Sequence, residues 1–141
     1  MRVGLGFSFS VWLLIVSIAV VFVAPALSSG KDDKAAPNME SVEEGKELFK
    51  TKGCVACHTI GGGKLSGPDL QGVTERREEE WLTKWIKSPD TMVFSDPIAK
   101  EMLAEYMIPM PNQGLSDEEV VEVISYLKFE DSKKEEKLKN N

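Results

Sequence analysis

Two cysteines and a histidine lie together in the run Cys54-Val55-Ala56-Cys57-His58. At this spacing the two thiols can add across the vinyl groups of a haem as thioethers, and the adjacent imidazole can reach one axial position of the iron. A redox-active dithiol and a local disulfide are the other interpretations of two cysteines at this spacing. Covalent attachment of haem is the interpretation that also uses the histidine.

The residue counts exclude most other metal sites. The chain has 2 cysteines and 1 histidine, too few for a four-cysteine zinc or iron–sulfur site, or for a zinc site of two cysteines and two histidines. A thioredoxin-like dithiol normally follows a strand, whereas the flanks of this run predict a helix and then a glycine-rich loop. A disulfide between residues this close is rarer still.

With no second histidine, the other axial ligand is expected to be a methionine, whose soft sulfur favours ferrous iron. The methionines after the N-terminal apolar segment are Met39, Met92, Met102, Met107 and Met110. Met39 lies in a predicted linker, Met92 just follows a helix break, and Met102 has the helical spacing of a core residue. The choice therefore narrows to Met107 and Met110. Prolines on both sides of Met110 restrict its backbone, so its thioether would lose little entropy on binding iron, but both methionines stay open on the residues alone.

The N-terminus predicts export. Residues 1–27 carry a basic residue, Arg2, at their start and continue into an apolar stretch with small residues near its end, typical of a signal peptide. Residues 3–27 also exceed the roughly 20 residues needed to cross a bilayer, so the segment can equally remain as a membrane anchor. Either outcome places the rest of the chain in the periplasm or on the outer face of the cytoplasmic membrane.

Composition divides the remainder into three parts. Residues 28–40 predict a flexible linker and residues 130–141 a charged, disordered tail, which leaves 41–129 as one small domain. A haem would add apolar surface to a core of this size. The net charge of −6 argues against nucleic acid as a partner and is compatible with docking on a basic patch of a redox protein.

The domain is predicted to be all-α. Ser41-Val42-Glu43-Glu44 has the pattern of a capping box and opens a first helix, which Gly53 ends immediately before the cysteines. The last helix is expected to open at Ser116-Asp117-Glu118-Glu119, a second capping box. Its apolar stripe is Val120, Val123, Ile124 and Leu127.

Two further helices are expected between these. Apolar residues at helical spacing, including Trp81 and Trp85, predict a helix that Ser88-Pro89 stops. Asp96-Pro97 supplies a cap and a first-turn proline for another, running to about Tyr106. No segment alternates as a strand.

Together these features resemble class I monohaem cytochrome c over residues 41–129. Gly45 and Phe49 on the first helix and Tyr126 on the last match the family pattern. The resemblance implies a small all-α fold in which the N- and C-terminal helices cross, with the glycine allowing close approach, around one covalently bound haem.

The resemblance also implies the site. Haem c would be held through Cys54 and Cys57, and the axial ligands would be His58 and Met110. Two further residues would contact this site: the carbonyl of Pro68 would accept a hydrogen bond from the histidine ring, and Leu70 would pack on the haem. Arg76, Arg77, Trp81 and Trp85 remain open between binding the haem propionates and ordinary roles in the core and in helix ion pairs.

Such a protein is expected to be an electron carrier and not an enzyme, because both axial positions are filled and no second histidine provides acid–base chemistry. The expected function is single-electron transfer in a respiratory chain outside the cytoplasm. The resemblance allows a quinol-oxidising complex as donor and a terminal oxidase or nitrogen-oxide reductase as acceptor. The alternative is a membrane-anchored haem c subunit of a larger respiratory or denitrification oxidoreductase complex.

Overall fold

The computed structural model of the chain describes residues 38–139. The predicted leader, 1–27, and all but the last three residues of the predicted linker, 28–40, lie outside these residues. The helices are α1 (Met39–Thr51), η2 (Cys54–Ala56), α2 (Val73–Arg76), α3 (Glu79–Lys87), α4 (Pro89–Met92), α5 (Pro97–Tyr106) and α6 (Asp117–Lys139). No strand occurs within 38–139, so the predicted all-α class is confirmed. None of the helices in this range is both long and apolar enough to cross a membrane.

The first helix begins earlier than its sequence pattern suggests. The Asn38 side chain, and not that of Ser41, caps α1, because its Oδ1 accepts a hydrogen bond from the Glu40 backbone N–H at 3.1 Å. The predicted capping box at residues 41–44 is therefore wrong. Met39 and Glu40, assigned to the linker, belong to the first turn. The predicted end is confirmed: Gly53 has φ +80° and turns the chain toward Cys54.

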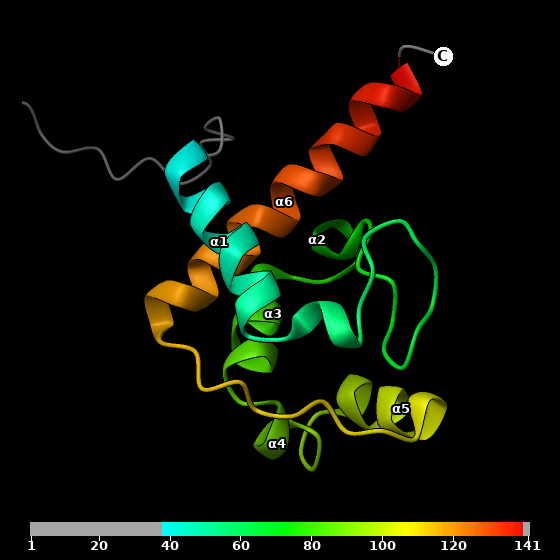
Figure 1. The fold of residues 1–141 in the computed structure, drawn as a ribbon. Coiled ribbons are helices and arrows are strands. Elements are labelled where there is room, and N and C mark those ends of the chain that lie inside the picture. Colours follow the sequence, from blue (N-terminus) through cyan, green and yellow to red (C-terminus); the bar gives the residue numbers. More distant parts are fainter. Residues whose placement is uncertain (1–37, 140–141) are drawn as a thin grey trace, which may run out of the picture. The chain divides into compact units, whose positions relative to one another are not determined.

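The helices α1 and α6 cross, as the resemblance implied (Figure 1). At the crossing, a Cβ on Gly45 would lie 2.0 Å from the carbonyl oxygen of Glu122, so only glycine permits this approach. The rings of Phe49 and Tyr126 pack beside it with centroids 5.6 Å apart. The crossing places the C-terminal end of α1, and with it the two cysteines, beside the core.

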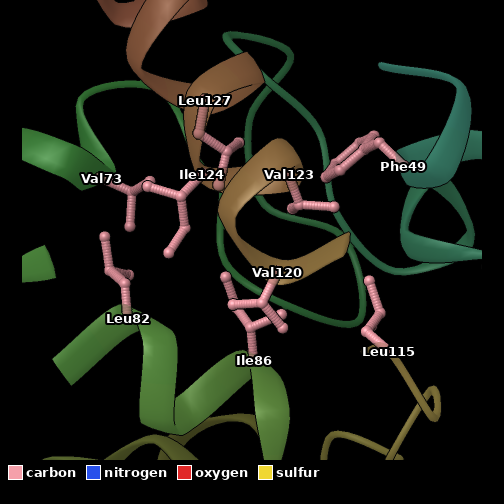
Figure 2. Packing of buried hydrophobic residues seen from close by; sticks show 9 residues of the cluster. All are labelled: Phe49, Val73, Leu82, Ile86, Leu115, Val120, Val123, Ile124 and Leu127. Carbon is pink, nitrogen blue, oxygen red and sulfur yellow. The ribbon is translucent and has the colours of Figure 1, made fainter. Parts of the chain in front are cut away.

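The core lies on one face of α6. Figure 2 shows Val120, Val123, Ile124 and Leu127 between Phe49 of α1 and two side chains of α3. The nine buried residues of this cluster are Phe49, Val73, Leu82, Ile86, Leu115, Val120, Val123, Ile124 and Leu127. The predicted apolar stripe of the last helix is thus confirmed as the part of the core to which the other helices pack.

The remaining helix boundaries follow local chemistry. Ser116 and Glu119 form the predicted capping box, since the Ser116 N–H donates to the Glu119 carboxylate at 2.7 Å and the Glu119 N–H donates to Ser116 Oγ at 3.1 Å. Asp96 caps α5 through the Ala99 N–H at 2.9 Å, with Pro97 in the first turn. Ser88 separates α3 from α4, as the proline after it predicts.

The C-terminal prediction is partly wrong. Helix α6 continues to Lys139, so the residues after Phe129 are helical and not a disordered tail as far as the structure describes them. Asp131, within that supposed tail, is only 3% exposed. Composition misled here because the charged residues after Phe129 pair with each other along the helix, for example Lys133 with Glu130 at 2.8 Å.

Candidate functional site

One cavity brings all six predicted site residues together. Its lining includes Cys54, Cys57, His58, Pro68, Leu70 and Met110. Helix α1 and η2 deliver the cysteines and the histidine, the loop after them delivers Pro68 and Leu70, and the segment after α5 delivers the methionine. The other walls are mostly apolar side chains from α3, α5 and α6. The cavity thus contains thiols, an imidazole and a thioether within a largely apolar enclosure.

The cysteines sit on a single turn. The backbone N–H groups of Cys57 and His58 both donate to the Cys54 carbonyl, at 3.1 Å and 3.0 Å, which closes the turn η2. Both thiols are half-buried, and burial raises the pKa of Cys54 above its ordinary value of 9.0. Reactive dithiols depend on a lowered thiol pKa, so this environment does not favour the redox-dithiol interpretation.

The orientation of the His58 ring is fixed by a hydrogen bond to the backbone of Pro68. His58 Nδ1 lies 2.9 Å from the Pro68 carbonyl oxygen, and since a carbonyl only accepts, Nδ1 carries the proton in this hydrogen bond. The other ring nitrogen, Nε2, then has a lone pair for a metal. Gly67 permits the arrangement, because a Cβ there would lie 2.6 Å from His58 Cε1.

Asp69, for which the sequence pattern predicts no role in the site, organises the loop that carries Pro68. Its carboxylate accepts backbone N–H bonds from Gln71 at 2.8 Å, Gly61 at 2.9 Å and Gly63 at 2.5 Å, and a hydroxyl bond from Thr59 at 3.0 Å. These bonds, first that from Gln71, lower the pKa of Asp69 from 3.8 to about 2. The signal in the sequence was an aspartate beside turn-forming glycines, which favours an Asx turn.

The two competing methionines occupy different environments. Met107 ends α5 with φ +59° and its side chain is 79% exposed, whereas Met110 is half-buried and lines the cavity. Met102, predicted as a core residue, is only half-buried and lines the cavity as well. Geometry therefore favours Met110 over Met107 as a residue available to a group in the cavity.

Two tryptophans of α3 form one wall. The rings of Trp81 and Trp85 stack with centroids 5.7 Å apart and 18° between their planes, and both line the cavity. The Nε1 atom of Trp81 is buried and has no hydrogen-bond acceptor among the described residues. The guanidinium of Arg77 lies 5.6 Å from the Trp81 ring centroid. Arg76 donates to the backbone carbonyls of Asp69 and Gln71.

These residues fit a covalently attached haem. The thiols and the imidazole share one turn, the walls are apolar, and the buried indole N–H of Trp81 lacks an acceptor that a bound group could provide. The donor set also suits iron of the electron-transfer type, with an imidazole nitrogen and a thioether sulfur available in the same cavity.

Comparison with known proteins shows sequence similarity to the cytochrome c family and to two individual proteins. Residues 42–129 match the family model described as cytochrome c. The chain is 29% identical over 96 residues to the C subunit of nitric oxide reductase from Stutzerimonas stutzeri, covering 64% of this chain and 58% of that protein. It is 53% identical over 34 residues to cytochrome c-551 of Azotobacter vinelandii, covering 24% and 40%. The matches thus span only about half the length of these relatives.

Solved structures of cytochrome c proteins have a similar fold. The cytochrome c from Rhodothermus marinus superposes with a TM-score of 0.68 at 26% identity, covering 74% of this chain and 88% of that one. The cytochrome c domain of a Pseudomonas putida protein superposes with a TM-score of 0.56 at 40% identity, covering 62% and 88%. Both are small cytochrome c folds, as expected for this chain.

Proposed function

Because this chain belongs to the cytochrome c family, whose members are electron carriers that bind haem c covalently, we propose that it transfers single electrons through one haem c held by Cys54 and Cys57. The observation that carries the proposal is the shared cavity, in which both thiols, the single histidine and Met110 meet. When bound, the haem iron supplies the one-electron ferrous–ferric couple. No catalytic residue is assigned.

The roles of the chain's residues follow from their contacts. His58 would hold the haem iron through Nε2, since its Nδ1–H is engaged by the Pro68 carbonyl at 2.9 Å. Met110, which lines the same cavity, would hold the iron through its sulfur, with Pro109 and Pro111 restricting the backbone on each side. Leu70, which packs against the core cluster and lines the cavity, would pack on the haem.

Trp81 and Arg77 are proposed to receive a haem propionate. The buried indole N–H needs an acceptor, and the guanidinium next to the ring supplies a positive charge. Arg76 has a different role in this proposal, because its guanidinium already donates to two loop carbonyls. Trp85 stacks on Trp81 and fixes the ring that donates.

Covalent attachment is tested by expressing the full chain with a haem-attachment system and staining a denaturing gel for haem. The wild type is expected to retain haem through denaturation, and the variant Cys54→Ser with Cys57→Ser is expected to lose it. Ser116→Ala, distant from the thiols in sequence, serves as a control that retains haem. A wild type without covalent haem would overturn the proposal.

A closed iron site is tested with carbon monoxide. If His58 and Met110 both hold the iron, no position would be left for the gas, so ferrous protein is expected not to bind it at neutral pH. Rapid formation of a carbon monoxide complex in the wild type would contradict the ligation by both His58 and Met110.

The second proposed function is that of a haem-bearing subunit in a larger respiratory or denitrification complex, supported by the similarity to the nitric oxide reductase protein. In both versions the haem domain is exported. A shuttle would take electrons from a quinol-oxidising complex and pass them to a terminal oxidase or nitrogen-oxide reductase, whereas a subunit would relay them within its own complex. Fractionation of the native host separates them: a shuttle is expected in the soluble periplasmic fraction with its leader removed. A subunit is expected in membranes with residues 3–27 intact and in a stable complex with other chains.

A further inference from the structure

Asp131 is the one charged side chain that is buried within the part of the chain that the structure describes. It lies on α6 beyond residue 129, where the match to the family model ends. A buried carboxylate is costly unless hydrogen bonds satisfy its oxygens, so its partners indicate what it does.

All of its hydrogen bonds go to one short segment, residues 71–74. Oδ1 accepts from the Gly72 backbone N–H and from Gln71 Nε2, the latter at 3.1 Å. Oδ2 accepts from the backbone N–H of Thr74 at 3.0 Å and from its Oγ1 at 2.7 Å. The carboxylate therefore caps the N-terminus of α2 from a different helix and fastens residues 71–74 to α6.

That segment directly follows the residues on the histidine side of the cavity. Pro68 accepts the His58 ring N–H, and the Leu70 N–H donates to the Thr59 carbonyl at 2.8 Å. The Arg76 guanidinium ties α2 back to the same loop through the carbonyls of Asp69 and Gln71. A continuous set of hydrogen bonds and short backbone links therefore joins Asp131 to the His58 ring.

We propose that Asp131 is a positioning residue for His58: by fastening residues 71–74 to α6, it keeps the Pro68 carbonyl on the ring N–H. This role rests on the proposed function, because it concerns the imidazole as an iron ligand. A carbonyl that accepts from a ligating imidazole makes the ring more basic, and a more basic ligand favours ferric iron and lowers the reduction potential. Weakening the fastening is therefore expected to raise the potential.

The test uses the full-length, haem-loaded protein and three variants. Asp131→Asn removes the charge and replaces one carboxylate oxygen by an NH2 group. This group faces the donors of either residues 71 and 72 or residue 74 and cannot accept from them. Thr74→Val removes one hydrogen-bond donor and leaves the charge of Asp131 in place. Glu136→Gln, an exposed change of the same charge on the same helix, is the matched control. The reduction potential and the NMR-detected exchange rate of the His58 Nδ1–H are measured for each.

Asp131→Asn and Thr74→Val are both expected to raise the potential and to speed exchange of the ring proton, the threonine variant by less. Glu136→Gln is expected to change neither. If Asp131→Asn does not fold, the Thr74→Val result decides on the same two measurements.

Three outcomes overturn the role. Lower thermal stability with unchanged potential and exchange would show that Asp131 acts only as a helix cap. A shift of potential in Asp131→Asn alone, with normal ring-proton exchange in both variants, would assign the effect to the lost charge and not to positioning. A wild type that carries no covalent haem would overturn the proposed function and, with it, this role.

Discussion

Gly45 on α1 lies directly against the backbone of Glu122 on α6, so closely that a Cβ on Gly45 would stand 2.0 Å from the Glu122 carbonyl oxygen. The obstacle is backbone, which cannot swing aside as the end of a side chain can. The crossing of the two longest helices, and hence the position of the cysteines at the end of α1, depends on this one missing methyl group.

Gly45→Ala is therefore expected to destabilise the protein by at least about 1–3 kcal/mol, the usual cost of overpacking a fitted interface. Helix propensity alone predicts the opposite sign, a gain of about 1 kcal/mol for alanine in place of glycine. Chemical denaturation followed by circular dichroism gives the free energy of unfolding. Glu47→Ala, on the exposed side of α1, is the control and should change it by less than about 0.5 kcal/mol. A Gly45→Ala variant as stable as the wild type would contradict the close crossing.

The start of α1 can be tested by comparing two caps. Asn38→Ala removes the side chain that accepts the Glu40 N–H and is expected to cost about 1 kcal/mol of stability. Ser41→Ala, at the position that the sequence pattern favoured, is expected to change stability by less than about 0.5 kcal/mol, because Ser41 lies inside the helix. The denaturant concentration at the unfolding midpoint measures the stability of both variants, provided that the dependence of the unfolding free energy on denaturant is unchanged. The reverse ranking would restore the helix start predicted from the capping box.

Asp69 is expected to make the stability of the protein depend on acid. Its pKa is lowered from 3.8 to about 2 in the folded state by the backbone N–H bonds of Gln71 and Gly61. A lowered folded-state pKa means that the carboxylate stabilises the fold above about pH 4, and that this contribution disappears as the pH falls from about 4 to about 2. Asp69→Asn should thus be less stable than the wild type at pH 7 and should lose less stability over that acidic range.

Thermal unfolding midpoints, measured from pH 7 to pH 2, give the change of stability with pH for the wild type and for Asp69→Asn. Asp117→Asn provides a comparison, because the Asp117 carboxylate is 93% exposed and pairs only with Lys87 at the surface. Equal slopes for the wild type and Asp69→Asn between pH 4 and pH 2 would contradict the role of the carboxylate in the loop.

Met110 and Met107 differ in burial, and matched variants separate them. Met110→Ala is expected to abolish the spectral band of sulfur-ligated ferric haem and to open the iron to carbon monoxide, since the thioether lining the cavity is lost. Met107→Ala is expected to leave both properties unchanged, because its side chain is 79% exposed. Optical spectra of the oxidised and reduced proteins provide the measurement. Persistence of sulfur ligation in Met110→Ala would shift the assignment to another methionine, with Met102 tested next because it lines the same cavity.

The parts of the fold that could be predicted are those governed by neighbouring residues. The reciprocal bonds of Ser116 and Glu119, the Asp96 cap with its following proline, and the left-handed Gly53 all depend on groups within a few positions. The start of α1 was misplaced because two polar residues, Asn38 and Ser41, both suit a cap. Local pattern cannot rank them.

In the candidate site, too, features set by neighbouring residues could be predicted and features set by tertiary packing could not. The run from Cys54 to His58, proposed to attach haem, is contiguous, so its chemistry can be predicted from five successive residues. For Trp81 the sequence shows only that the residue is a tryptophan. Whether its indole N–H is buried without an acceptor depends on the side chains that pack around it. Asp131 was assigned to a tail because its neighbours in sequence are charged.

The amino-acid sequence by itself predicted haem attachment at the cysteines and histidine, and it determined the helical class and most helix ends, because each rests on residue types and spacings within one turn or loop. Tertiary structure decided that Gly45 meets Glu122, that Met110 and not Met107 lines the cavity, and that Asp131 fastens residues 71–74. Gly72 and Asp131 are 59 positions apart, and only the packing of α6 against the other helices brings them together. Contacts of that kind arise from burial and backbone approach in three dimensions, which no local spacing encodes.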